Sequence, residues 1–382
     1  MAEAVIVEAV RSPIGKRSGA LSGVHPAELS AQVLNGLVDR AGLEPDVVED
    51  VIWGCVMQAG DQALDIARTS VLAAGWPETI PGVTIDRQCG SSQQSVHFAA
   101  AGVVAGHYDV VIAGGVESMS RVPMGSSLAS GGRPLPAAFL KRYDGTIPHQ
   151  GIGAEMVAEQ WRLDRTELDE FALGSHEKAA AAQDSGAFDD QIVAITDQDG
   201  NPVLKDEGIR RGGTVEKMAQ LKPAFKPDGV IHAGNSSQIS DGAAALLFMS
   251  AEKAKSLGCK PIARVHTATL AGANPVIMLT APIPATRKAL QRSGLSIDQI
   301  GAYEVNEAFA PVPLAWLRDI GADPDRLNPH GGAIALGHPL GGSGARLMTT
   351  LLYHMRNNGI RYGLQTMCEG GGQANTTILE LL

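Results

Sequence analysis

Aromatic side chains are scarce in this 382-residue chain and make up only 4% of it. Glycine is abundant, with 45 residues, and 44% of the chain is hydrophobic. This composition excludes a disordered protein and predicts cores built from small and β-branched side chains with close backbone approaches. At this length we expect two or three lobes rather than one core.

Cysteine is also rare. The four cysteines, Cys55, Cys89, Cys259 and Cys368, are widely scattered and form neither a CxxC pair nor a Cys/His cluster at metal-ligand spacing. We therefore expect neither a disulfide framework nor a zinc site.

Long apolar runs and an excess of basic residues are missing as well. No stretch approaches the roughly 18 apolar residues of a membrane helix, and the N-terminal segment carries acids where a signal peptide carries bases. The net charge of −10 argues against a general nucleic-acid surface but leaves room for a local basic pocket. We expect a cytoplasmic protein with neither a nucleic-acid nor a membrane partner.

Strand and helix patterns alternate in the first third of the chain, which is typical of a layered α/β fold. Strands are predicted at Val5–Val10, Asp50–Cys55, Thr84–Gln88 and 109–115, and helices at His25–Ala41, Ala63–Ala74 and from Cys89 to about Gly106.

The residue pattern changes near Met119, and the change lasts to about Asn235. Gly, Pro and Ser punctuate 123–148, helices are predicted at Ala154–Trp161 and Arg165–Gln183, and a charged stretch follows. Such an excursion from a core commonly carries ligand-binding elements.

After Asp241 the alternation resumes in an order that repeats the first third. Strands are predicted at Ala263–Thr269, Ala302–Val305 and Tyr362–Cys368, and helices at Ile283–Ser293 and Gly341–Asn357. The pattern predicts a duplicated α/β core with a long insertion after the first copy.

Cys89 lies between a predicted strand and a small-residue helix. At a helix start, unpaired N–H groups and the positive end of the helix dipole favour the reactive thiolate. The alternative is a small buried hydrophobe, which describes most free cysteines.

Three further segments combine reactive side chains with glycine-rich backbone: 303–310 around Asn306 and Glu307, 330–344 around His338, and 367–373 around Cys368. Each has a simpler interpretation, namely a helix cap for Asn306 and Glu307, an ordinary turn at His338, and a buried inert thiol at Cys368. The stretch Gly341-Gly342-Ser343-Gly344 does not form a phosphate loop, because no Lys follows at the required spacing.

Together, these segments supply what a thiol nucleophile requires. Histidine is the usual base, glycine-rich turns present N–H groups to a developing oxyanion, and a second thiol offers a further acid or base.

The ordered series of motifs closely resembles that of thiolases, the acetyl-CoA acetyltransferases and 3-ketoacyl-CoA thiolases. The motifs are Cys89-Gly90-Ser91, Gly114-Gly115-Val116-Glu117-Ser118-Met119, Asn306-Glu307-Ala308-Phe309, 331–339 with Gly337-His338-Pro339, and Cys368-Glu369-Gly370. The resemblance covers effectively the whole chain.

The resemblance implies a duplicated, layered α-β-α-β-α core with a large inserted loop domain. Residues 1–118 and about 240–260 would form the half with the nucleophile, residues 119–239 the loop domain that binds coenzyme A (CoA), and residues 261–382 the half with the acid and base.

The resemblance also implies thiolytic cleavage of a 3-ketoacyl-CoA, or the reverse Claisen condensation, through an acyl-Cys89 intermediate. His338 would activate Cys89 and, with a water held by Asn306, stabilise the thioester oxygen. Cys368 would move the α-carbon proton, and the N–H groups of Cys89 and Gly370 would form a second oxyanion hole.

CoA would be a substrate, with no tightly bound cofactor. Arg210 would face its adenine nucleotide and Ser237 its pantetheine arm, while His149 would lie near the acyl thioester; the tunnel would be lined by Phe225, Ala233, Ala308 and Phe309. Without the resemblance, Arg210 would be interpreted as a solvated surface charge. Thiolases are dimers or dimers of dimers, so a homodimer or homotetramer is implied.

Two positions depart from common thiolase patterns. Ser92 stands where many members have glycine, and Gln150 replaces the Met that packs against a small acyl group in acetoacetyl-CoA enzymes. The stretch 87–94 is similar to thiolases of bacterial degradative pathways, including steroid-degrading ones. We therefore expect a degradative enzyme with a roomier or more polar acyl pocket.

Three alternatives stay open at this point: an acetoacetyl-CoA-specific acetyltransferase, a related condensing enzyme such as a ketoacyl synthase or hydroxymethylglutaryl-CoA synthase, and a non-catalytic acyl-CoA or lipid-binding scaffold. Cys368 and the context of His338 favour a thiolase over the condensing enzymes. A complete set of Cys89, Asn306, His338 and Cys368 argues against a scaffold.

Overall fold

Ten strands form one mixed sheet in the computed structural model, which describes residues 3–129 and 131–382. Their spatial order is β10-β11-β12-β9-β1-β8-β5-β3-β4, with the short β2 paired to β8. The strands are β1 (Ala4–Arg11), β2 (Gly15–Lys16), β3 (Asp50–Gly54), β4 (Gly82–Ile85), β5 (Val110–Ser118), β8 (Ser240–Ser250), β9 (Ala263–Gly272), β10 (Ala302–Val305), β11 (Tyr362–Glu369) and β12 (Gln373–Leu381).

The strand order confirms the predicted duplication. Inside the edge strand β4, the first half runs β3-β5-β8-β1, and from its own edge inward the second half runs β10-β11-β12-β9. In each half the first pair is parallel and the next two are antiparallel, and the halves meet where β1 pairs briefly with β9.

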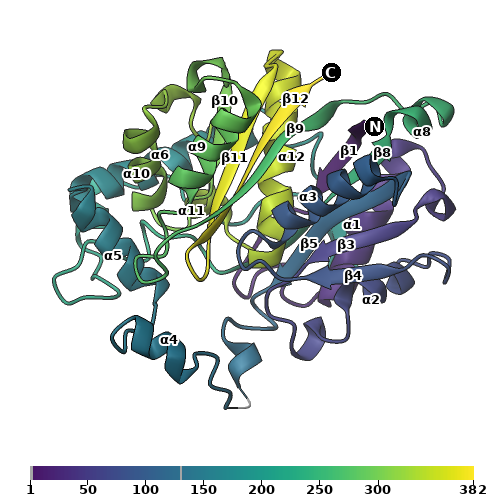
Figure 1. Ribbon diagram of the computed structural model, residues 1–382. Helices are drawn as coiled ribbons and strands as arrows, with labels where there is room; N and C mark the ends of the chain where they lie inside the picture. Colours follow the sequence, from purple (N-terminus) through teal and green to yellow (C-terminus); the bar gives the residue numbers. More distant parts are fainter. Residues whose placement is uncertain (1–2, 130) are drawn as a thin grey trace.

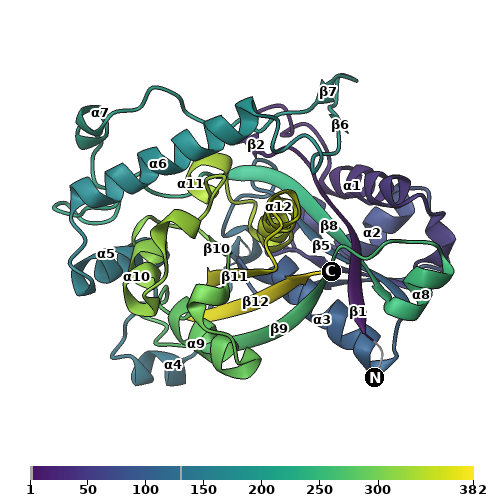
Figure 2. The ribbon, with the colours of Figure 1, turned by 90° about the horizontal axis from the view of Figure 1, so that it is seen from above.

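Helices complete a layered α-β-α-β-α arrangement. Helices α1 and α2 cover the outer face of the first half, α9 packs on the outer face of the second with α10 against it, and α3 and α12 lie between the halves (Figures 1 and 2). The helices are α1 (Pro26–Ala41), α2 (Ile66–Ala73), α3 (Ser91–Ala105), α4 (Ala137–Arg142), α5 (Gln150–Gln160), α6 (Arg165–Asp184), α7 (Val215–Ala219), α8 (Ala251–Ser256), α9 (Pro282–Ser293), α10 (Pro311–Ile320), α11 (Ala333–Leu336) and α12 (Ser343–Asn358).

Alternation along the strands explains the layers. Successive side chains of a strand point to opposite faces. In β8, Leu247 and Met249 pack with α1 and α2, whereas Leu246 and Phe248 pack with α3 and α12. Because both faces are covered, the strand is continuously apolar from Ala243 to Met249, and its eleven residues are all buried.

Most predicted elements are present, with shifted ends. Helix α2 begins at Ile66 instead of Ala63, because Leu64 and Asp65 adopt positive φ angles of 58° and 53°. Strand β4 ends at Ile85, three residues before Gln88, and α3 begins two residues after Cys89.

The excursion places α5, α6 and α7 beside the second half, whereas its segment Ile195–Thr196 packs on α1 of the first half (Figures 1 and 2). It contains α4, α5, α6 and α7 and a small separate sheet of β6 (Ile195–Thr196) and β7 (Pro202–Val203). Helix α5 packs on α10 and α6 packs on α11, so the insertion reaches the turns that carry the Asn306 and His338 motifs of the second half. No described helix is long and apolar enough to cross a membrane.

Candidate active site

Cys89 occupies a tight turn between β4 and α3. Gln88, just before it, has a φ of +49°, which few side-chain-bearing residues adopt. Ser91 stabilises the turn, since its hydroxyl accepts from the Arg87 N–H at 2.9 Å and donates to the Gln88 carbonyl at 2.6 Å. The turn thereby places the thiol, only 6% exposed, at the start of α3.

The free thiol is less acidic than its position in the sequence predicts. Burial raises the pKa of Cys89 to about 12, and the nearby Glu369 carboxylate adds to the rise. The N–H groups of Cys89 and Gly370 lower the pKa but do not outweigh burial. The helix start thus favours the thiolate as expected, but desolvation outweighs its effect on the pKa of Cys89.

His338 lies in the turn between α11 and α12, with its side chain fixed by hydrogen bonds. Its Nδ1 lies 2.6 Å from Ser343 Oγ, and Ser343 donates its own hydrogen to the Pro339 carbonyl at 2.8 Å. Nδ1 therefore carries the ring hydrogen, which leaves the Nε2 lone pair free as an acceptor.

Asn306 lies next to that lone pair. Its Nδ2 is 3.4 Å from His338 Nε2, while its buried Oδ1 has no hydrogen-bond partner. Burial and the Arg346 guanidinium lower the pKa of His338 to about 3, so the imidazole is neutral at physiological pH and able to accept a proton.

Cys368 and Gly370 enter the same cavity from the end of β11. The cavity has a volume of about 160 Å³ and is lined by Cys89, His338, Cys368 and Gly370 together. Burial raises the pKa of Cys368 well above its usual range, and charge on Cys89 raises it further. The structure therefore gathers all five predicted catalytic residues, with Asn306 contacting His338.

Two glutamates of the motifs act as anchors. Glu307 accepts hydrogen bonds from Ser175, Asn328 and the Ile334 N–H, and so holds the turn that leads to His338. Helix α10 begins after Ala310 without a side-chain cap, so the simpler interpretation of a helix cap is wrong.

Glu117 plays the same part in the first half. It accepts from the N–H groups of Val56, Met57 and Gly341 at 2.8–3.0 Å and from Gln62 at 2.7 Å. These bonds tie the loop after β3 to the turn between His338 and α12.

The predicted CoA contacts lie along a path that leaves the cavity. Phe225, Ser237, Ala308 and Phe309 line the catalytic cavity, and His149 packs on Phe225 with ring centroids 5.5 Å apart. A wider hollow of about 680 Å³ shares Ser237, Gln238 and Ile239 with it and also contains Ala233 and Arg210.

Sequence reasoning missed several residues along this path. Lys16 and Arg17, just after the first strand, line the wider hollow together with Arg210, and these three cations outnumber the one carboxylate of its lining, Glu207. Met119, Met124, Leu279 and Leu340 form apolar walls of the catalytic cavity. Lys16 and Arg17 are adjacent basic residues soon after the first predicted strand, and that pairing was a usable signal in the sequence. No local pattern distinguishes Leu279.

The two departures from the thiolase pattern have different consequences. Gln150 lines the catalytic cavity, as expected. Ser92 does not: its hydroxyl accepts from the Ala345 N–H at 2.9 Å and joins α3 to the first turn of α12. The expectation that Ser92 shapes the acyl pocket is therefore wrong, because its side chain points between the two central helices.

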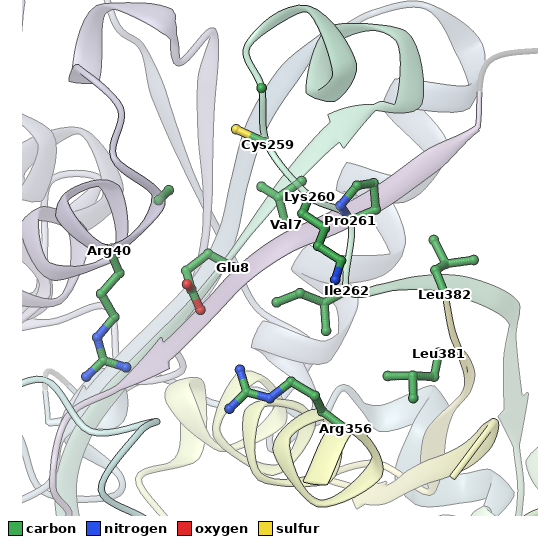
Figure 3. Close-up of a pocket in the computed structure, with 12 residues that line it drawn as sticks. Val7, Glu8, Arg40, Cys259, Lys260, Pro261, Ile262, Arg356, Leu381 and Leu382 are labelled. Atoms are coloured by element: carbon green, nitrogen blue, oxygen red, sulfur yellow. The ribbon is translucent and has the colours of Figure 1, made fainter. Parts of the chain in front are cut away.

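Another cavity, of about 420 Å³, lies away from this chemistry, between β1, α1, the end of α12 and the C-terminus. In Figure 3, Arg40 and Arg356 lie on either side of Glu8, and Cys259 lies at the far end. The described residues that line it include the Cys259 thiol but no histidine. This cavity therefore lacks the combination of thiol and imidazole that Cys89 and His338 form.

The fold and the site bring two thiols, an oriented imidazole and backbone N–H groups into one cavity, the set of groups that an acyltransferase with a thiol nucleophile requires. The sequence matches the thiolase N-terminal domain over residues 4–252 and the thiolase C-terminal domain over residues 259–381. The chain belongs to the thiolase family, as its motifs predicted.

Similar proteins extend along the whole chain. It is 50% identical to a steroid 3-ketoacyl-CoA thiolase of Mycobacterium tuberculosis, covering 100% of this chain and 95% of that protein. It is 43% identical to a 3-ketoacyl-CoA thiolase of Photobacterium profundum, covering 100% of both. The crystal structure of an acetyl-CoA acetyltransferase of Bacillus anthracis superimposes with a TM-score of 0.92 at 41% identity, over 100% of this chain and 99% of that one.

Proposed function

We propose that this thiolase cleaves 3-ketoacyl-CoA substrates in a degradative pathway and that Cys89 carries the acyl group. The observation that carries the proposal is the single cavity lined by Cys89, His338 and Cys368, with Gly370 at its wall. A binding scaffold has no need of two thiols and an oriented imidazole in one cavity.

The neutral pair of Cys89 and His338 suits a proton transfer that accompanies attack. With the Cys89 pKa raised to about 12 and that of His338 lowered to about 3, an ion pair is disfavoured before substrate binds. As the sulfur attacks the 3-keto carbon, its proton passes to Nε2, and the bond to the departing acetyl-CoA breaks.

Cys368 would protonate the α-carbon of the departing acetyl-CoA and then accept the thiol proton of the second CoA. The Cys89 and Gly370 N–H groups, which already face the Cys89 sulfur, would stabilise one oxyanion. The unpaired Asn306 Oδ1 beside His338 supports a bound water at the other oxyanion position.

CoA would enter through the wider hollow. Lys16, Arg17 and Arg210 supply positive charge at its rim, which attracts phosphates to a chain of net charge −10. Ser237 lies where the two hollows meet and would contact the pantetheine arm, with Phe225, Ala308 and Phe309 around it.

For the acyl group we propose a bulky or ring-bearing chain. Similarity to the steroid thiolase of M. tuberculosis supports this substrate class. Gln150 supports it as well, because a polar side chain replaces the Met that packs on small acyl groups. The alternative is an acetoacetyl-CoA-specific enzyme, supported by the structural likeness to the acetyl-CoA acetyltransferase.

Acyl trapping tests the proposed function. After incubation with an acyl-CoA, intact-protein mass spectrometry should show one added acyl group, and peptide mapping should place it on Cys89. Cys89→Ser should lose the adduct and thiolysis, whereas Cys259→Ser, outside the cavity, should retain both. An unmodified Cys89 peptide in active wild-type protein would contradict the proposal.

We also propose a homo-oligomer, with a homodimer as its basic unit, in a reducing compartment such as the cytoplasm. Exposed apolar side chains lie around the sheet edge at β4, namely Leu64, Leu72, Val83 and Phe98. All four cysteines are free, which suits a reducing compartment.

A further inference from the structure

Glu369 is a buried carboxyl group that the mechanism above does not use. It is the last residue of β11, between Cys368 and Gly370, and only 1% of it is exposed. Neither of its carboxyl oxygens has a hydrogen-bond partner. A buried carboxyl without partners carries a large desolvation cost, so its position calls for an explanation.

The carboxyl group occupies the space beside the residue that follows the nucleophile. A Cβ atom at Gly90 would lie 1.9 Å from Glu369 Oε1, so a larger residue at this position would displace the carboxyl. The same Cβ would lie 3.1 Å from Asn375 Oδ1, another buried oxygen without a partner. Two buried oxygens thus lie around Gly90. The backbone N–H of Asn375 lowers the pKa of the Glu369 carboxyl, but burial outweighs this effect and favours a proton on it.

Charged and titratable groups surround Glu369 on every side. The turn before α3 contributes Asp86, Arg87 and Cys89, and β11 contributes Cys368. From α3, His97 contacts Asn375 and not the carboxyl itself, and Glu117 of β5 acts more weakly on Cys89.

Arg87 does not neutralise the carboxyl through an ion pair. Its Nη1 donates to Gln373 Oε1 at 3.0 Å, and its buried Nε has no partner. The ion pairs among the described residues do not include Arg87 with Glu369. Arg87 thus acts on Glu369 only through space, whereas Glu369 lines the same cavity as Cys89 and Cys368 and its charge reaches both thiols.

We propose that Glu369 is a positioning residue that sets the reactivity of both active-site thiols through its own charge: the protonated carboxyl permits thiolate formation, and the ionised carboxyl opposes it. This inference rests on the proposed function only in taking Cys89 as the nucleophile.

The pKa shifts of Glu369, Cys89 and Cys368 have the directions that this proposal requires. Burial raises the pKa of Glu369 to about 8, and Arg87 lowers it in part. Ionised Glu369 in turn raises the pKa of Cys89 and of Cys368. The carboxyl therefore gains its charge close to the working pH, and each thiol becomes harder to ionise as it does so.

The rate of Cys89 alkylation by iodoacetamide, followed by peptide mass spectrometry from pH 6 to pH 10, tests this coupling without requiring catalysis. An isolated thiol well below its pKa reacts about tenfold faster for each pH unit. In the wild-type protein the slope should fall below that value near pH 8, where Glu369 ionises. A wild-type line that stays straight through this range would overturn the proposal.

Glu369→Gln keeps the shape of the side chain and removes its charge. Its alkylation rate should rise with an unbroken slope and exceed the wild-type rate above pH 8, by about tenfold for each unit by which the Cys89 pKa falls. Glu304→Gln is the matched control, because Glu304 is also buried and its pKa is also raised to about 8, yet it does not act on Cys89. The Glu304→Gln variant should keep the fall in slope that the wild-type alkylation rate shows near pH 8. The same fall in slope in Glu369→Gln would overturn the proposal.

The outcome is separable from the proposed function. Loss of the acyl adduct and of thiolysis in Cys89→Ser tests the role of Cys89. The slope of the alkylation rate against pH tests Glu369 alone. If Glu369→Gln does not fold, as judged by circular dichroism, the slope of the wild-type alkylation rate against pH still tests the proposal.

Discussion

At the scale of single residues, Gln150 offers a direct test of acyl preference. It is the first residue of α5 and lines the cavity that contains the two thiols and His338. Its amide needs hydrogen-bond partners that a small acyl group does not supply. A longer or polar acyl chain can fill the same space.

Gln150→Met should shift preference toward acetoacetyl-CoA, since an apolar side chain packs against a small acyl group. Thiolysis measured on a panel from acetoacetyl to long, branched and ring-bearing 3-ketoacyl-CoAs should show a change of about tenfold in the ratio of kcat/KM values. Gln160→Met, at the exposed end of the same helix, should leave the ratio unchanged. A wild-type enzyme that cleaves acetoacetyl-CoA far faster than every other substrate would contradict the proposed acyl class.

At the scale of elements, close backbone contacts hold the turn before α12 against the first half. A Cβ at Gly341 would lie 2.5–2.7 Å from the backbone of Gly54, Cys55 and Val116. The Gly341 N–H also donates to Glu117 at 2.8 Å. Packing of the two halves at this point therefore requires a glycine.

Gly341→Ala should lower the free energy of unfolding by about 1–3 kcal/mol, because backbone atoms must move apart. Gly174→Ala, in the interior of α6, meets nothing within 4 Å and should raise it by roughly 0.5–1 kcal/mol. Urea unfolding of the two variants measures both effects. Equal stability of Gly341→Ala and wild type would show that the turn moves freely.

At the scale of the whole molecule, β4 leaves one edge of the sheet unpaired within the described chain. Val83 on this strand is 42% exposed, and Leu64 nearby is 92% exposed. An apolar edge strand is a ready site for pairing with a second copy.

Val83→Lys should shift the protein toward monomers, because a charged residue on an edge strand opposes pairing. Light scattering after size-exclusion chromatography measures the mass directly. Leu204→Lys, at an exposed position of the excursion, is the control and should leave the mass unchanged. A wild-type monomer would contradict the proposed dimer.

Much of the fold was predictable because its signals are local. The buried runs at 5–10, 51–55 and 302–305 indicate strands by their apolar continuity, and the repeated element order indicates the duplication. The start of α2 was misplaced because Leu64 and Asp65 adopt positive φ angles without a Gly or Pro to mark the change. The end of β4 was misplaced because its pairing with β3 stops at Ile85, a limit set by the neighbouring strand. The domain boundaries stay a prediction.

The sequence alone identified the groups to which we assign the chemistry in our proposal, since Cys89, Asn306, His338 and Cys368 are recognisable from their own motifs. Only the tertiary structure decided how they behave. Burial makes Cys89 a weak acid and His338 a neutral base, Ser343 assigns the ring hydrogen, and Glu369 lies beside Gly90. These properties depend on desolvation and on contacts between residues far apart in the chain, which no local pattern records.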